Sequence, residues 1–128
     1  MAYSNAVGNG TNDYLTTQIT ALVFITAAGV TLGTATMGYG AAAVVGVNSV
    51  ATANALPVNF TWSATGTVGG FRYMAGATVL GEFIGAWATS VSGGGGIVQL
   101  SSLSAVSGGS AQVTSATHSF PLKVQGEP

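Results

Sequence analysis

The sequence predicts a mainly β protein, an antiparallel β-sandwich or jelly-roll-like fold with a short N-terminal helix. Glycine accounts for 20 of the 128 residues and Ser, Thr and Val are abundant; these residue types favour strands and turns over helices. Short apolar segments also recur between glycine-rich turns, which is typical of sandwiches and jelly rolls. The length fits one domain with a core of its own.

The first residues predict an arm followed by a helix. Met1–Gly10 is small and polar, so we expect a loop or an extended arm. Good N-cap residues follow, and apolar residues from position 14 onward recur at helical spacing. We expect a helix from about Asn12 to Ala21 or Leu22, with a strand as the alternative because threonine favours strands. Residues 11–122 would form the single domain and residues 123–128 a polar tail.

An apolar segment, Ile19–Met37, contains no charged residue. Its hydropathy alone would suit a membrane helix, but five threonines and two glycines interrupt it. No Lys or Arg precedes Arg72 to orient a span or to begin an export signal. We therefore expect buried strands and no membrane segment. Val23–Thr26 would be one strand, Ala27–Gly29 its turn and Val30–Thr36 its hairpin partner.

The remaining chain predicts a series of short strands. We expect them at Val47–Leu56, Val58–Trp62, Thr65–Met74, Ala77–Gly85, Ile97–Leu100, Leu103–Val106 and Ala111–Leu122. Alternation in the second of these places Val58, Phe60 and Trp62 on one face. The Gly69-Gly70 pair indicates a bulge or a close backbone approach, and four consecutive glycines at 93–96 indicate a flexible loop.

The segment Ser63–Gly85 is the best candidate for a central hairpin. It contains Arg72 and Glu82, two of the five formally charged residues of the chain. These two positions have the same parity, so a hairpin turn of suitable length would bring them together on one sheet face. They would then form an ion pair that sets strand register. The alternative is that each contacts another subunit.

No residue pattern indicates catalysis. The chain has one histidine, His118, and no cysteine. A general base needs a partner within reach, and a metal needs three or four ligands. The acids Asp13, Glu82 and Glu127 lie in different segments. Alternation along the last strand would place His118 on a solvent or subunit face. We therefore predict no enzyme activity, no cofactor and no metal.

The scarcity of charge is the most informative property of the composition. Charged residues make up 4% of the chain, against roughly 25% in an average protein. A small free domain with so little charge would be poorly protected against association, so we expect partners to cover much of the surface. No basic patch is available for nucleic acid. The glycine clusters do not match a phosphate loop, and we expect no small-molecule substrate.

Four segments together resemble small structural proteins of tailed phages. They are AYSNAVGNGTNDYLTTQITALV, GYGAAAVVGVNSVATANALP, SATGTVGGFRYMAGATVLGEFIG and IVQLSSLSAVSGGSAQVTSATHSFP. The chain departs from that group at Ala27–Met37, which is apolar where those proteins carry a polar Gly-Pro loop. The resemblance implies a capsid decoration or cement protein, an auxiliary head protein located on the virion surface and made in the host cytoplasm. It implies no catalytic residues.

The expected partners are the major capsid protein and further copies of the chain. The alternatives are a tail or adaptor component, an extracellular filament subunit assembled by strand exchange and, with least support, a small hydrolase. The candidate interface residues are Tyr3, Asn5, Val7, Arg72, Glu82, Trp87 and His118.

Overall fold

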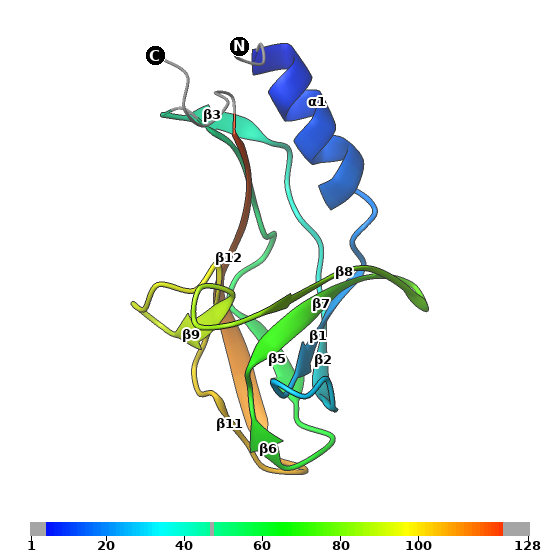
Figure 1. The fold of residues 1–128 in the computed structure, drawn as a ribbon, viewed down its shortest axis with the longest axis vertical. Coiled ribbons are helices and arrows are strands. Elements are labelled where there is room, and N and C mark those ends of the chain that lie inside the picture. The colour runs from blue at the N-terminus through cyan, green and yellow to red at the C-terminus, as the bar shows by residue number, and fades with distance from the viewer. Residues whose placement is uncertain (1–4, 47, 122–128) are drawn as a thin grey trace.

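The computed structural model describes residues 5–46 and 48–121 and, in these ranges, shows two larger β-sheets, a two-stranded sheet and one short helix (Figure 1). The first sheet has the antiparallel order β2 (Thr31–Thr36), β1 (Ala21–Ile25), β7 (Gly70–Ala75) and β8 (Thr78–Ile84). The second has the order β3 (Ala43–Val45), β4 (Asn48–Thr52), β12 (Ser110–Pro121), β10 (Val98–Leu100) and β9 (Thr89–Val91). β5 (Val58–Thr61) also pairs with β12, and β6 (Gly66–Thr67) pairs with β11 (Ser104–Ala105). The predicted β-sandwich with an N-terminal helix is therefore confirmed.

The helix α1 (Asn5–Thr16) lies earlier in the chain than the sequence predicted. The expected arm at Met1–Gly10 is wrong over residues 5–10, which are helical; residues 1–4 and the expected tail at 123–128 lie outside the described residues. The hydroxyls of Thr16 and Thr17 donate to the carbonyls of Asn12 and Asp13, four residues earlier. The Asp13 carbonyl also accepts a hydrogen bond from the Thr17 backbone nitrogen at 2.9 Å, so the hydroxyls add second donors to carbonyls near the end of the helix.

The buried face of α1 is small and polar. Gly8, Asn12 and Thr16 are buried at a spacing of four residues, whereas Tyr14, in the predicted apolar stripe, is 77% exposed. Asn12 Nδ2 donates to the carbonyl oxygens of Ser49 and His118, each at 3.0 Å. The helix therefore docks on β4 and β12 through hydrogen bonds. Burying the Asn12 amide would be costly if its N–H groups had no acceptors.

The apolar segment after the helix forms strands, as predicted. β1 and β2 make an antiparallel hairpin, with a turn at residues 27–28. Leu22 and Phe24 of β1 and Leu32 and Ala35 of β2 are fully buried. Within the described ranges α1, with 12 residues, is the only helix, and it is not long and apolar enough to cross a membrane.

An irregularity in β12 changes which of its side chains face the core. Gln99 of β10 pairs with Ser115 and Leu100 pairs with Val113, so the residue between, Thr114, is extra. Such a β-bulge reverses the alternation of side chains beyond it. Ala111 and Val113 are buried on one side of the bulge and Ala116 on the other. The predicted outward face for His118 is therefore wrong, since the prediction assumed unbroken alternation.

Aromatic rings from both sheets meet in the core. Phe24 of β1 stacks on Phe60 of β5 with ring centroids 5.1 Å apart, and Phe60 contacts Trp62 edge-on at 4.7 Å. Phe60 and Trp62 share the inner face that the sequence predicted for them. On β7, Phe71 and Tyr73 form a second aromatic group with Phe83 of β8. Rings packed in this way contribute both buried area and favourable edge-to-face contacts.

Two of the predicted glycine features have close backbone approaches. An added Cβ at Gly70 would lie 2.1 Å from the Phe83 carbonyl oxygen, and one at Gly69 would lie 2.5 Å from the Ala27 nitrogen. In the run of glycines at 93–96, expected as a flexible loop, Gly94 and Gly96 pack closely against β9, and a Cβ at Gly96 would lie 2.5 Å from the Ser90 nitrogen. Gly93 and Gly95 have no atom within 4 Å of an added Cβ. This tight return lets β9 and β10 pair in parallel, although a parallel pair ordinarily needs a connection of about a dozen residues.

We predict that Gly70→Ala destabilises the protein by more than about 2 kcal/mol, because the new methyl group overlaps backbone atoms that cannot move independently. Gly10→Ala is the matched control. It lies within α1 with no atom within 4 Å of the added methyl, so it should stabilise by about 0.5–1 kcal/mol. Urea unfolding followed by circular dichroism measures both. Equal effects of the two substitutions would contradict the close approach at Gly70.

Candidate interface surfaces

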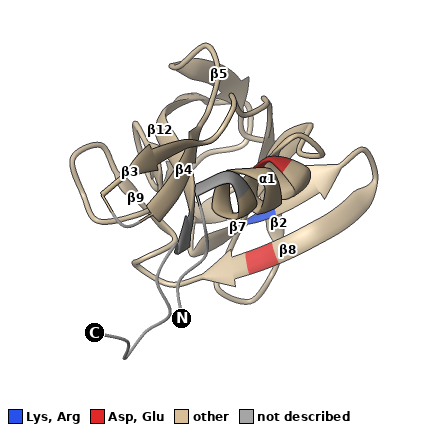
Figure 2. Ribbon diagram, turned by 90° about the horizontal axis from the view of Figure 1, so that it is seen from above, with Lys and Arg blue, Asp and Glu red and all other residues tan. Residues whose placement is uncertain are grey.

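Arg72 and Glu82 form the ion pair that the sequence predicted. They are register partners on the neighbouring strands β7 and β8, coloured blue and red there in Figure 2. Arg72 Nε lies 2.6 Å from Glu82 Oε1. Arg72 Nη2 also donates to the Gly29 carbonyl oxygen at 3.1 Å. Arg72 therefore spans from the edge strand β8 to the β1–β2 turn. The side chain of Glu82 is 43% exposed, so the pair contributes at most about 1 kcal/mol.

Trp87 lies in the turn between β8 and β9 and is 55% exposed. Its ring meets Phe83 edge-on with centroids 6.0 Å apart. Its indole also lies over Gly85, where an added Cβ would come 2.8 Å from the indole nitrogen. Val79 and Ile84 of β8 are exposed too. The β8 edge and its following turn thus present apolar side chains to solvent.

His118 is half-buried and faces the core, where it joins the two sheets. Its Nδ1 lies 2.9 Å from the Tyr73 hydroxyl, and the two rings meet edge-on with centroids 5.4 Å apart. Burial lowers the pKa of His118 and raises the pKa of Tyr73 to about 12. A neutral imidazole protonated on Nε2 accepts a hydrogen bond from the Tyr73 hydroxyl through Nδ1. His118 is therefore placed to tie β12 to β7.

Three of the predicted interface residues come from the first seven positions of the chain, and the structure describes them to different extents. Val7 is 52% exposed on α1. Asn5 is the first residue of that helix, with its side chain outside the described part, and Tyr3 lies outside the described residues altogether.

Among the predicted interface residues, the structure brings together Arg72 and Glu82 on β7 and β8. Trp87 lies in the turn that follows β8 and contacts Phe83. His118 is linked to the same strand β7 through Tyr73, but from the core side. Val7 lies on the helix, away from this edge (Figure 1). The predicted set is therefore not one continuous surface.

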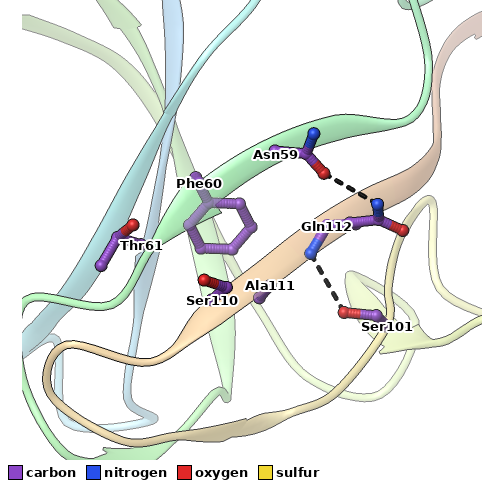
Figure 3. A pocket seen from close by; sticks show the side chains of 7 residues that line it. All are labelled: Asn59, Phe60, Thr61, Ser101, Ser110, Ala111 and Gln112. Atoms are coloured by element: carbon purple, nitrogen blue, oxygen red, sulfur yellow. Dashed lines mark hydrogen bonds between the residues drawn. The ribbon is translucent and has the colours of Figure 1, made fainter.

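Sequence reasoning missed a polar groove on the outer face of β5 and β12. The groove has a volume of about 530 Å³ (Figure 3), and its exposed lining residues carry amides and hydroxyls. Asn59 and Gln112 are register partners there, and Gln112 Nε2 donates to Asn59 Oδ1 at 2.8 Å. The alternation that places Phe60 on the inner face also indicates that Asn59 lies on the outer face. The pairing with Gln112 depends on strand register, which the sequence does not specify.

In the described ranges, no group of three or more His, Cys, Asp or Glu side chains could hold a metal ion. The charged residues within these ranges are Asp13, Arg72 and Glu82 (Figure 2). Asp13 Oδ1 accepts a hydrogen bond from the Ala42 nitrogen at 2.7 Å. Since Ala42 directly precedes β3, this carboxylate helps to hold α1 against β3.

No protein-family model matches the chain, and no curated protein or solved structure matches it either. The class that the structure defines is therefore a mainly β, sandwich-like protein with one short helix.

We predict that stability falls as the pH drops from about 7 to about 5, where unfolded histidine takes up a proton near pH 6.5. The folded pKa of His118 is lowered by burial. The unfolded chain therefore binds more protons than the folded chain below pH about 6.5, and unfolding becomes easier until the folded pKa is also passed.

The control for this prediction is His118→Gln, whose amide oxygen can still accept from Tyr73. Thermal unfolding of both proteins across the pH range measures the difference. The variant should lose most of the pH dependence, and an identical slope in the two proteins would show that His118 does not cause it.

Proposed function

We propose that this protein is a structural component of a phage particle that binds the outside of the capsid and cements it. It would contact capsid subunits and neighbouring copies of itself. The observation that carries the proposal is the near absence of charge: the described residues include three charged side chains, and Arg72 and Glu82 neutralise each other. The resemblance of four sequence segments to small tailed-phage proteins gives the kind of assembly.

Exposed apolar side chains support a role in assembly. A soluble monomer needs charge to prevent association, yet several large apolar residues of this chain face solvent. They are Val7, Tyr14, Val30, Val44, Val45, Val79, Ile84, Trp87, Val91 and Val106. Burying one such half-exposed side chain contributes roughly 1 kcal/mol. A cement protein that covers several of them in each copy would stabilise the assembled particle by mass action.

The sheet edges provide a second kind of contact. β8 ends the first sheet and β3 ends the second, and within the described part of the chain neither has a further strand beside it. All three residues of β3 are exposed. A free edge can accept a strand from another subunit. This observation also suits the alternative, a filament subunit or a tail or adaptor component assembled by strand exchange.

We expect the purified protein to co-sediment with capsids that lack it, assembled from the major capsid protein of the phage that carries this chain. Occupancy should saturate at a fixed number of copies per capsid. Trp87→Ser should lower the affinity several-fold, because it removes the largest exposed apolar side chain of the β8 edge region. Quantitative gel analysis of the pelleted fraction measures occupancy.

The control variant is Gln18→Ser, which changes an exposed polar side chain that is not among the apolar residues named above and should leave occupancy unchanged. Both variants should keep the unfolding midpoint close to that of the unmodified protein. A chain that stays monomeric and never pellets with capsids would contradict the cement role. Growth of filaments from the protein alone would favour the alternative.

A further inference from the structure

The outer face of the β5–β12 ladder carries a two-by-two array of polar side chains. Asn59 is the register partner of Gln112, and Thr61 is the register partner of Ser110. All four are exposed, and they line the groove of about 530 Å³ (Figure 3). Register partners lie about 5 Å apart across a ladder, and alternate residues about 7 Å apart along a strand. The array is therefore a compact rectangle of two amides and two hydroxyls.

The amide pair has a defined orientation. Gln112 Nε2 donates to Asn59 Oδ1 at 2.8 Å, which uses the oxygen of one amide and a nitrogen proton of the other. Asn59 Nδ2 remains as a donor and Gln112 Oε1 as an acceptor, and neither has a hydrogen-bond partner among the described residues. The pair thus offers one donor group and one acceptor to a ligand in the groove.

A third element keeps Gln112 in place. Its backbone nitrogen donates to Ser101 Oγ at 3.0 Å, and the Ser101 nitrogen donates back to the Gln112 carbonyl at 2.9 Å. Ser101 also lines the groove (Figure 3), and its hydroxyl proton is available to a ligand. The strand pairing therefore preorganises the array, which reduces the ordering cost of binding.

The lining chemistry selects the ligand class. The groove has no charged lining residue, so it has nothing to neutralise an anionic or a cationic ligand. The exposed lining side chains are amides and hydroxyls, so a purely apolar ligand would leave these groups without hydrogen bonds. The matching ligand is neutral, rigid and rich in groups that both donate and accept. Adjacent hydroxyls of a sugar ring have this property.

We propose that this groove is a binding site for a neutral carbohydrate. The backbone groups of β5 and β12 already pair with each other along the groove, so a peptide would find no strand edge there for β-augmentation. The sugar would use the donor of Asn59, the acceptor of Gln112 and the hydroxyls of Thr61, Ser110 and Ser101. This site goes beyond the capsid-binding role and can be tested on the free protein.

The test is titration of the ¹⁵N-labelled protein with glucose, galactose, mannose and N-acetylglucosamine, followed by two-dimensional NMR. The side-chain amide signals of Asn59 and Gln112 report directly on the groove. We expect at least one sugar to move these signals saturably at millimolar concentration, together with the backbone signals of Ser101 and Ser110. Gln112→Met removes both amide groups and should raise the dissociation constant by at least about tenfold.

The matched control is Gln18→Met, which changes an exposed glutamine outside the groove and should leave the titration unchanged. Tri-alanine is titrated in parallel as a neutral peptide. The proposal is overturned if none of the four sugars shifts the groove signals, if Gln112→Met binds as well as the unmodified protein, or if tri-alanine shifts the same signals while the sugars do not.

Discussion

Strand β12 connects most of the molecule, and the bulge at Thr114 decides how it does so. The strand pairs with β5 and β4 on one edge and with β10 on the other. Because the bulge reverses the alternation, Ala111 and Val113 face the core at one end, and Ala116 and His118 face it at the other. Without the extra residue, His118 would lie on the opposite face and could not reach Tyr73. The helix depends on the same strand, since Asn12 donates to the His118 carbonyl.

The features that the sequence predicted correctly arise from local patterns. The β1–β2 and β7–β8 hairpins follow from short apolar runs around turns, and the Arg72–Glu82 pair follows from parity across one of them. The helix position was wrong because its buried face carries Gly8, Asn12 and Thr16 in place of an apolar stripe. The Asn12 amide nitrogen donates to the carbonyls of Ser49 and His118, residues distant in the chain, so no local pattern reveals the docking.

The candidate surfaces also include some that the sequence could reveal and one that it could not. Arg72, Glu82 and Trp87 could be selected from the sequence because the chain has only five charged residues and two tryptophans. The polar groove could not, since it depends on the register that places Asn59 beside Gln112 and Thr61 beside Ser110. The close packing of Gly94 and Gly96 against Ser90 could not be predicted for a related reason: a glycine-rich sequence suits both a flexible loop and a tight one. In each case a contact between distant residues determines the outcome.

Arg72 and Glu82 neutralise each other, and several large apolar side chains are exposed. Exposed apolar side chains of this kind suit contacts with other subunits. The most direct test of the proposed capsid role is electron cryomicroscopy of the phage particles that carry this chain. We expect density of this sandwich-like fold on the outer capsid surface, bridging neighbouring capsid subunits. Particles with a complete capsid and no such density on the head would contradict it, and density confined to the tail would favour the tail or adaptor role instead.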